Sequence, residues 1–474
     1  MNGKDMYDGV TDIRDDLIDG AKSSPKRQKR HIKARWFGAV AAVLVLAILV
    51  GIFLRPDGGL TAYALAEAQY PQMAPYPGEP HTEKEFEDWW ESVKAQRRDL
   101  GDISSLQAFF RNSSGVFLTD TGGQNKVYSP LNVYMALSML AQLTDGESRG
   151  QILTLLGNDS LDTLRRQAND VWNANYRDDG ALTSILASSL WLNKDISFNQ
   201  ETMDTLARDF YASSYQGEMG TDAYDKALQE WLNQQTGGLL EDQAGNVAMD
   251  PETILALATT VYYQAKWGHE FSEDSTGPQT FHSPTGDIET DFMHQRDDQT
   301  YYWGEHFAAI SQGFEEGGEM WFILPDEGIT PEKLLSDEEA MEFLFYRKEW
   351  ENSKFLFVNK SIPKFDVSSQ FDLGDGLRKL GVTDVFDPSR ADFTPMTTDV
   401  DVPIAVSGAN HAVRVVIDEE GCTAAAFTVM LAAGAAMPPD EEVDFVLDRP
   451  FLFCITGDSG LPLFVGIVNI PAGD

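Results

Sequence analysis

The sequence has few cysteines and little basic charge. Only two of its 474 residues are cysteines, Cys422 and Cys454, too few for a disulfide framework or a cysteine-rich zinc site. Thirty-six lysines and arginines face 75 aspartates and glutamates, which gives a formal net charge of −39. Because a surface this acidic repels phosphate backbones, we expect no nucleic-acid partner.

Recognisable catalytic and cofactor motifs are also missing. The chain contains no GxSxG, Walker A or GxGxxG sequence, and Gly268-His269-Glu270 does not continue to HExxH. The seven histidines are scattered, and we expect no metal and no cofactor. A Ser-His-Asp triad can be dispersed along a chain, so an exported hydrolase with an unrecognised triad stays open as an alternative.

Charge itself is missing from three long stretches. Asp, Glu, Lys and Arg are absent for 18 residues or more only over residues 36–54, 127–144 and 421–439. Residues 1–35 hold nine basic and six acidic residues, a net charge of +3, which leaves −42 for the rest of the chain. Each uncharged stretch therefore needs its own explanation.

Residues 36–54 predict a membrane anchor. As a helix this segment is about 28 Å long, which matches a hydrocarbon core of roughly 30 Å. Six of the ten residues before it are basic, so the positive-inside rule predicts a single-pass protein with a cytoplasmic N-terminus and an extracellular main domain. A cleaved signal peptide with Ala62-Tyr63-Ala64 as its small-x-small site is the alternative, and it predicts a secreted protein. The simple anchor favours a bacterial source.

The remaining chain divides into a stalk and one large domain. Residues 55–102 predict a Pro-rich stalk and a short amphipathic helix with Trp89 and Trp90, which we expect to pack on the domain. A small protein-contact site is the alternative for the two Trp. The predicted organisation is a cytoplasmic basic segment (1–35), a transmembrane signal anchor (36–54), the stalk and helix (55–102) and the main domain (103–474).

Residues 127–144 predict a buried helix. Ser129 is a suitable N-cap, Pro130 suits the first helical position, and the segment behind them is apolar on nearly every side. A second membrane span is the alternative, but interspersed polar residues and the DGES that follows disfavour it. Downstream, helical spacing in LDTLRRQANDVWNANY alternates with strand patterns such as SILASSLWLN and ILALATTVYYQAKW. The mixture predicts an α+β fold and not a βαβ repeat.

The third uncharged stretch, residues 421–439, fits no ordinary element. A membrane span would have acidic residues at both ends and too little bulk. A core helix would start on Gly421, contain Gly434 and end at a pair of prolines. An exposed loop of small, uncharged and apolar side chains has the chemistry of a segment that joins a β-sheet. We therefore favour a long loop that can become a strand.

Several blocks of the sequence resemble the serpin family. VVIDEEGCTAAAFT, then DRPFLFCI and PLFVGIVNIP, resemble the hinge, reactive loop and closing strands of a serpin. VYSPLNVYMALSML, YYQAKW, MWFILPDEG and IPKFDVSSQFDLGDGLRKLGVTDVFD are similar to further family blocks, in the same order. The resemblance covers 103–474. It implies an α+β serpin-like fold with three β-sheets, eight or nine helices and an exposed reactive-centre loop near the C-terminus.

The resemblance implies a serine protease inhibitor and not an enzyme. A serpin offers its loop as a substrate, and the cleaved loop inserts as a new strand in the main sheet before the acyl-enzyme hydrolyses. The protease is distorted and trapped, so the inhibitor is an irreversible suicide substrate with a metastable native fold. A non-inhibitory surface protein with the same fold is the alternative. We expect a monomer whose partners are serine proteases.

The resemblance assigns a hinge that is suited to insertion. The hinge comprises Glu419, Glu420, Gly421, Cys422, Thr423, Ala424, Ala425 and Ala426. Because strand side chains alternate, Cys422, Ala424, Ala426 and Thr428 would point into the sheet, and all four are small and uncharged. A charge at such a position would cost several kcal/mol to bury and would stall insertion. Gly421 supplies a flexible pivot.

The reactive bond follows from the hinge. Counting Glu419 as the seventeenth residue before the bond, as in the family, places it between Ala435 and Ala436. The loop is a few residues longer than usual, so the window also includes Ala433, Gly434 and Met437. All candidates are Ala, Gly or Met, which predicts a protease with a shallow apolar primary pocket, elastase-like or subtilisin-like.

Four further positions match residues that control sheet opening in the family. They are Ser129, Asn132, Trp267 and His411. Asn132 stands where Ser is usual and Thr259 where Asn is usual, so we expect the opening network to be rebuilt or weakened. Plain core packing is the alternative for Trp267 and His411.

Overall fold

The computed structural model describes residues 63–78, 81–346, 350–397, 399, 403–422 and 441–471. All of them belong to one unit, Thr61–Asp474. The predicted anchor at 36–54 and the loop from 423 to 440 lie outside the described residues. Within those ranges, no helix has both the length and the hydropathy to cross a membrane.

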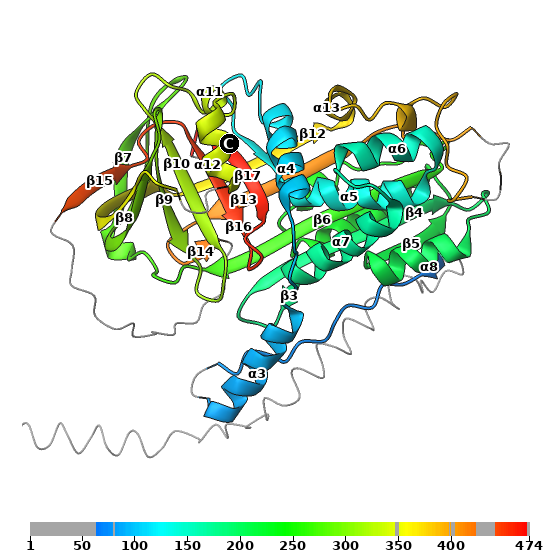
Figure 1. Cartoon of the computed structure of the whole chain (residues 1–474), viewed down its shortest axis with the longest axis horizontal. Coiled ribbons are helices and arrows are strands. Elements are labelled where there is room, and N and C mark those ends of the chain that lie inside the picture. The colour runs from blue at the N-terminus through cyan, green and yellow to red at the C-terminus, as the bar shows by residue number, and fades with distance from the viewer. Residues whose placement is uncertain are drawn as a thin grey trace, which may run out of the picture. The chain divides into compact units, whose positions relative to one another are not determined.

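The strands among the described residues form two sheets (Figure 1). One of them, called the main sheet below, has eight of these strands. In order across the sheet they are β1 (Tyr63–Ala66), β5 (Ala212–Gly217), β4 (Thr183–Asn193), β6 (Leu255–Lys266), β14 (Gly421–Cys422), β13 (Asn410–Ile417) and β12 (Phe365–Asp372), with β3 (Arg177–Asp178) paired to β4. The two strongest strand patterns in the sequence are therefore the neighbours β4 and β6, which pair antiparallel along almost their whole length.

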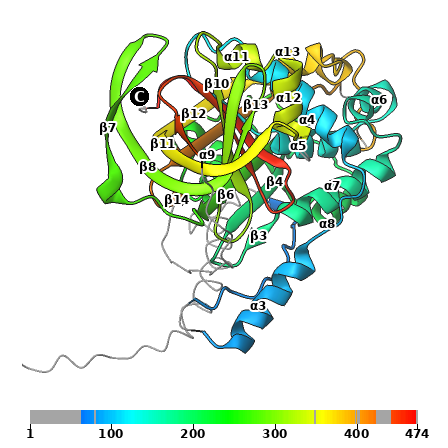
Figure 2. The same ribbon diagram turned by 60° about the vertical axis from the view of Figure 1, so that its left-hand side comes forward.

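The other sheet has nine strands. In order they are β15 (Glu442–Val446), β11 (Ser353–Pro363), β8 (Gly286–Trp303), β9 (Phe307–Gly313), β10 (Glu319–Pro325), β16 (Phe451–Thr456), β17 (Pro462–Val468) and β2 (Lys126–Tyr128), with β7 (Thr276–Ser283) paired to β8. The α+β class is as predicted, and strand pairing joins the described strands into two sheets where three were predicted. Strand β8 is 18 residues long, and it pairs with β7 and β11 and then, at Tyr302 and Trp303, with β9. One long curved strand thus joins what would be two sheets (Figure 2).

The described residues contain eleven α-helices, where eight or nine were predicted. They are α3 (Glu83–Gln96), α4 (Ser104–Phe117), α5 (Pro130–Leu143), α6 (Gly146–Leu155), α7 (Leu161–Asn175), α8 (Gln200–Asp209), α9 (Asp222–Gln235), α10 (Glu241–Ala244), α11 (Pro331–Leu334), α12 (Glu338–Tyr346) and α13 (Gly374–Lys379). Two 3-10 helices, η1 (Glu273–Ser275) and η2 (Asp384–Phe386), complete the set. The difference comes in part from α10 and α11, single turns of four residues that are too short for a helical period to reveal.

The predicted buried helix is α5. The Ser129 hydroxyl accepts a hydrogen bond from the Asn132 backbone N–H at 3.3 Å, and Pro130 occupies the first turn as expected. Thirteen of its fourteen residues are buried. The helix contacts β6 of the main sheet and β17 of the other sheet. The core interpretation of this uncharged stretch is therefore confirmed.

Residues 63–78 and 81–102, predicted as a stalk and a short helix, pack on the domain. Strand β1 pairs antiparallel with β5 and extends the main sheet by one strand. The Tyr70 ring lies 5.4 Å from the ring of Trp172. Helix α3 occupies the predicted amphipathic segment. Trp89 lies on the buried side of this helix, and only 1% of its surface is exposed. This segment therefore forms the edge of the domain and not a free spacer.

Candidate functional site

Two residues of the predicted hinge already form a strand. Gly421 and Cys422 lie between β6 and β13 as β14, with Gly421 opposite Lys266 and Cys422 opposite Ala265 on β6. Cys422 also pairs with Ile417 of β13. The main sheet has therefore begun to accept a new strand at this end, called the hinge end below.

Close packing against β6 explains the glycine at position 421. A Cβ atom there would lie 2.3 Å from the carbonyl oxygen of Ala265 and 2.8 Å from the Cα of Lys266. Any side chain would force the β6 backbone to move. Glycine is therefore required by the contact itself, in addition to the flexibility that the sequence predicted.

Cys422 is the one inward-facing hinge residue that the structure describes. It is 3% exposed. Tyr263 stands two residues before Ala265, the β6 partner of Cys422, so alternation places it on the same face of β6 as Ala265. Burial raises the pKa of Tyr263 well above its ordinary value, and Cys422 raises it further. The other hinge residues, Thr423, Ala424, Ala425 and Ala426, and the window Ala433, Gly434, Ala435, Ala436 and Met437 lie outside the described residues.

Two residues after β6 hold the backbone where the hinge begins, at Asp418, Glu419 and Glu420. The indole N–H of Trp267 donates to the Asp418 carbonyl at 2.9 Å, and its backbone N–H donates to the Glu420 carbonyl at 3.0 Å. The Phe271 N–H donates to the Glu419 carbonyl at 3.0 Å. Trp267 is 2% exposed, and its ring stacks on Phe314 at 4.9 Å. The residue predicted to stand where the hinge enters thus contacts the hinge directly.

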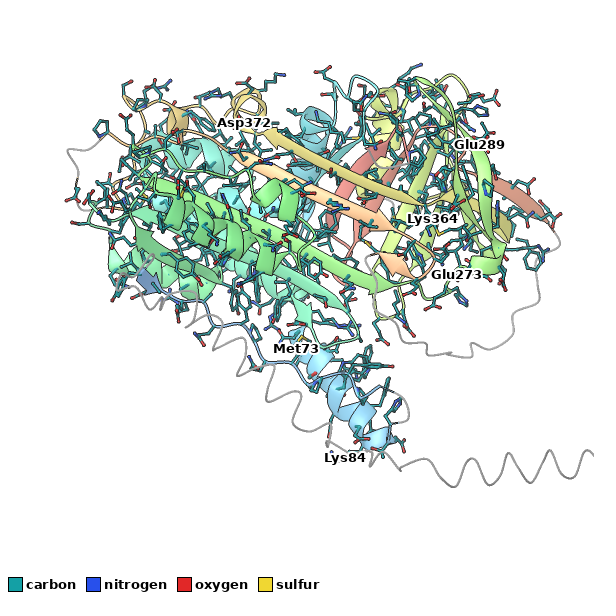
Figure 3. All side chains as sticks on the ribbon, turned by 180° about the vertical axis from the view of Figure 1, so that it is seen from behind. Met73, Lys84, Glu273, Glu289, Lys364 and Asp372 are labelled. Atoms are coloured by element: carbon teal, nitrogen blue, oxygen red, sulfur yellow. The ribbon has the colours of Figure 1, made fainter. Side chains whose placement is uncertain are left out.

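An ion pair also fixes the residue at the base of the hinge. Lys364 Nζ lies 2.8 Å from Glu419 Oε2, beside the hinge end of the main sheet (Figure 3). Burial opposes ionisation of Glu419, but the hydrogen bond from Lys364 lowers its pKa. The same hydrogen bond raises the pKa of Lys364. Both groups are therefore charged at neutral pH.

Three of the four predicted sheet-opening residues, Ser129, Asn132 and His411, belong to one hydrogen-bond network, whereas Trp267 lies at the hinge end. The Ser129 backbone N–H donates to His411 Nε2 at 3.1 Å, and the Asn132 amide donates to the Thr259 carbonyl of β6 at 3.2 Å. Burial lowers the pKa of His411 to about 3, so the imidazole is neutral and can accept that hydrogen bond. Thr259 takes part through its backbone and not its side chain. The network connects β13 to β6 through α5, with Asn132 making the link to β6.

A narrow cavity lies close to this network. Residues of both β6 and β13 line it, together with Ser129 and Asn132: Thr260, Val261, Tyr262, Ala412, Val413 and Arg414. These residues lie farther from the hinge end along both strands than the β14 pairs do. If β14 continued along the main sheet, it would run between β6 and β13 past this cavity. Ser129 and Asn132, which the sequence assigned to sheet opening, therefore border the space that the longer strand would need.

The family model for the serpins, described as serine protease inhibitors, matches residues 113–471. The chain belongs to the serpin family. Serpin-Z1C from Triticum aestivum is 28% identical over 371 residues, which cover 74% of this chain and 91% of the relative. The leukocyte elastase inhibitor from Homo sapiens is 27% identical over 384 residues, 78% of this chain and 100% of the relative. The native state of tengpin, a thermophilic serpin, has the same fold: TM-score 0.70 at 23% identity, covering 86% of this chain and 100% of tengpin.

Some residues of this serpin's site were not singled out from the sequence. Lys364 lies in the quoted block IPKF and Tyr263 in YYQAKW, but neither was given a role. Phe314, which stacks on Trp267, belongs to no quoted block. The opposite charges of Lys364 and of the acidic run 418–420 were a usable signal for an ion pair. The aromatic stacking had none, because it joins residues 47 positions apart.

Proposed function

We propose that this serpin is an irreversible suicide-substrate inhibitor of serine proteases and not an enzyme. The observation that carries the proposal is β14, which already lies between β6 and β13 and is followed directly by the predicted loop. After cleavage the loop would extend β14 along the main sheet and draw the acylated protease with it. Small residues at Ala424, Ala426 and Thr428 would let the strand form without burying a charge.

Elastase-like or subtilisin-like proteases are the proposed targets. The reactive bond is proposed between Ala435 and Ala436, within the window 433–437, where every residue is Ala, Gly or Met. A shallow apolar pocket accepts such residues, whereas a trypsin-like pocket needs Lys or Arg. The relative named leukocyte elastase inhibitor supports an elastase-like target.

The proposed location is the outer face of a cell membrane. Residues 36–54 would anchor the chain with its N-terminus in the cytoplasm, and the inhibitory domain would act outside as a monomer. A bacterial surface fits this simple arrangement. Protease digestion of intact cells tests it: the domain should be released while the basic segment 1–35 stays protected. Recovery of a mature chain that begins near residue 63 would instead indicate a cleaved signal peptide.

Incubation with an elastase, followed by a denaturing gel, tests the inhibitory mechanism. We expect an SDS-stable complex and a released C-terminal peptide that begins at Ala436. Ala426→Arg should abolish the complex and leave a cleaved serpin, because the charge would enter the sheet. Ala425→Arg is the matched control, since alternation places it on the opposite face and the complex should persist. Cleavage of the native chain with no complex would contradict inhibition and favour a non-inhibitory serpin.

A further inference from the structure

We propose that helix α3 positions the reactive-loop hinge, with Trp89 as the positioning residue. Helix α3 precedes the family match at 113–471, and a cluster of buried charges links it to the hinge end of the main sheet. The functional consequence rests on the proposed inhibition by loop insertion. The chain of contacts itself does not, and it can be tested without a protease.

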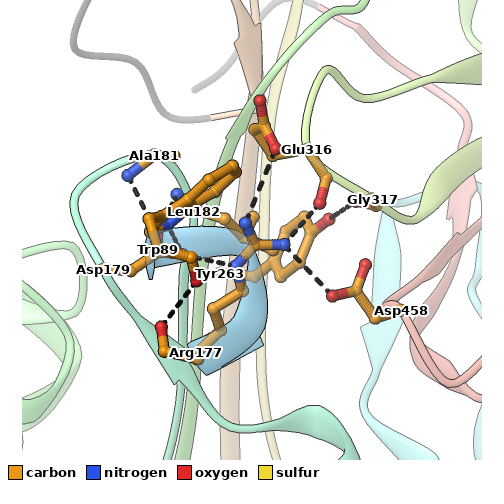
Figure 4. A network of polar contacts seen from close by, with 10 residues as sticks. Trp89, Arg177, Asp179, Ala181, Leu182, Tyr263, Glu316, Gly317 and Asp458 are labelled. Atoms are coloured by element: carbon orange, nitrogen blue, oxygen red, sulfur yellow. Dashed lines mark hydrogen bonds and ion pairs between the residues drawn. The ribbon is translucent and has the colours of Figure 1, made fainter. Parts of the chain in front are cut away.

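The centre of the link is a buried arginine. The Arg177 side chain is 4% exposed and faces three carboxylates: Asp179 at 2.7 Å, Asp458 at 3.2 Å and Glu316 at 3.6 Å (Figure 4). Asp179 follows β3 in the main sheet, Glu316 lies in the turn between β9 and β10, and Asp458 lies in the turn between β16 and β17. A single guanidinium therefore ties the main sheet to two turns of the other sheet.

Trp89 completes this cluster from α3. Its indole N–H donates to Asp179 Oδ2 at 2.9 Å, the same oxygen that receives the hydrogen bond from Arg177 Nε. The Arg177 guanidinium also lies over the Trp89 ring, 5.5 Å from its centroid. Asp179 Oδ1 accepts from the backbone N–H groups of Ala181 and Leu182. Trp89 therefore supplies both a hydrogen bond and an aromatic cover to the buried pair of Arg177 and Asp179.

The cluster depends on that cover because its charges are unbalanced. Burial opposes the charge on Arg177, yet the surrounding carboxylates raise its pKa above the ordinary value. Burial raises the pKa of Glu316 to about 7 and that of Asp458 above its usual range, although Arg177 opposes both shifts. Removing one partner from a buried charge cluster leaves the others uncompensated, so their positions respond to its loss.

The turn that carries Glu316 leads to the hinge. Arg177 Nη1 donates to the Glu316 carbonyl at 2.5 Å, and the Tyr263 hydroxyl donates to the next carbonyl, Gly317, at 3.0 Å. A Cβ atom on Gly318 would lie 2.3 Å from the Thr456 carbonyl oxygen and 2.8 Å from the Tyr263 hydroxyl. The turn is thus tightly packed against Tyr263, which stands two residues from Ala265, the β6 partner of Cys422.

A second contact runs from the same turn to the same hinge. Phe314 begins the turn and stacks on Trp267, whose indole N–H holds the Asp418 carbonyl. Two aromatic residues of the β6 region, Tyr263 and Trp267, therefore connect the turn to the hinge. With Trp89 in place the turn is fixed, and Gly421 and Cys422 stay between β6 and β13. Loosening α3 would let the hinge leave the sheet.

The rate of thiol labelling at Cys422 directly measures how readily the hinge leaves the main sheet. The reduced native protein and the Trp89→Phe variant are treated with iodoacetamide, and labelled peptides are quantified by mass spectrometry. Trp89→Phe keeps a ring but removes the N–H that binds Asp179. We expect Cys422 to label about tenfold faster, the factor expected for the loss of one hydrogen bond to a charged group. Cys454, which is 0% exposed in β16, should stay protected and serves as the internal reference.

Trp90→Phe is the matched control on the same helix. Trp90 is half-buried and its ring faces Lys94 and Arg97, at 5.7 and 5.2 Å, so Cys422 should keep its native labelling rate. Equal rates at Cys422 in the native, Trp89→Phe and Trp90→Phe proteins would overturn the proposal. If Trp89→Phe also makes Cys454 accessible to iodoacetamide, Asp458→Asn is used as the test variant instead. Faster labelling of Cys422 would then support the proposal, and an unchanged rate would overturn it. Absence of an SDS-stable complex while this labelling pattern is found would contradict the proposed inhibition alone.

Discussion

Lys364 Nζ lies 2.8 Å from the carboxylate of Glu419, so the residue just before β12 holds the first residue of the hinge. The Glu419 carbonyl meanwhile accepts a hydrogen bond from Phe271, beyond the end of β6. The base of the hinge is therefore fixed from both sides of the gap that the loop would enter. The ion pair is partly exposed, with 38% of the Lys364 side chain and 12% of the Glu419 side chain accessible to solvent.

Lys364→Gln should lower the free energy of unfolding by about 1 kcal/mol, because Glu419 keeps its charge in a partly buried place without its partner. Urea unfolding at low and high salt measures the loss. Lys354→Gln is the control: its pair with Glu441 is at 2.6 Å, but both side chains are about half exposed or more, so little should change. Equal losses in the two variants would contradict a special contribution from Glu419.

Gly421→Ala should expel the hinge from the main sheet, because the new Cβ would overlap the Ala265 carbonyl. Overpacking of this kind costs about 1–3 kcal/mol, and moving the hinge out relieves it. Faster labelling of Cys422 is the expected readout. Gly408→Ala should leave labelling unchanged, since a Cβ there meets nothing within 4 Å. If Cys422 in Gly421→Ala is labelled as slowly as in the native protein, the β6 backbone has moved and the hinge has stayed in the sheet.

Stability should fall at acid pH in a way that His411 controls. The folded pKa of about 3 lies below the unfolded value of about 6.5, so the unfolded state binds more protons between these values. The contribution is therefore complete above pH 6.5 and is lost as the pH falls toward 3. His411→Gln should show a flatter dependence of the free energy of unfolding between pH 6.5 and 4. The same slope in both proteins would contradict a neutral, buried imidazole.

Glu316 should lower stability as the pH rises, which is the opposite of the pH dependence that His411 produces. Its folded pKa of about 7 lies above the ordinary value of 4.5, so the folded state binds more protons between pH 4.5 and 7. Its contribution is complete below 4.5 and is lost as the pH rises through 7, by up to about 3 kcal/mol. Compared with the native chain, Glu316→Gln should lose less stability between pH 5 and 8. A larger loss in the variant would show that Glu316 is ionised and stabilising.

Local patterns predicted much of this fold from sequence. Helix α5 could be predicted because Ser129 and Pro130 form a capping signal and the following residues are almost all apolar. Strands β4 and β6 could be predicted from continuous runs of apolar and β-branched residues. A two-residue strand such as β14 has no periodicity, so the insertion of Gly421 and Cys422 could be anticipated only through the family resemblance.

Contacts between distant segments could not be predicted. The Arg177 cluster brings together Trp89, Glu316 and Asp458, which are widely separated in the chain and belong to no motif. Addition of β1 to the main sheet depends on an edge left open by β5, which no local pattern reveals. The merging of sheets through β8 likewise depends on the last two residues of a long strand, Tyr302 and Trp303, finding partners on β9. Such pairings are decided by the whole fold and not by local spacing.

Thermal unfolding of the intact and loop-cleaved protein tests loop insertion most directly. Cleavage within 433–437 by an elastase, confirmed by the mass of the C-terminal peptide, leaves the new end free to extend β14 between β6 and β13. If the native fold is metastable, the cleaved protein should melt far above the intact one, because the inserted strand completes the main sheet. An equal or lower melting temperature after cleavage would contradict insertion and, with it, the proposed inhibitory mechanism.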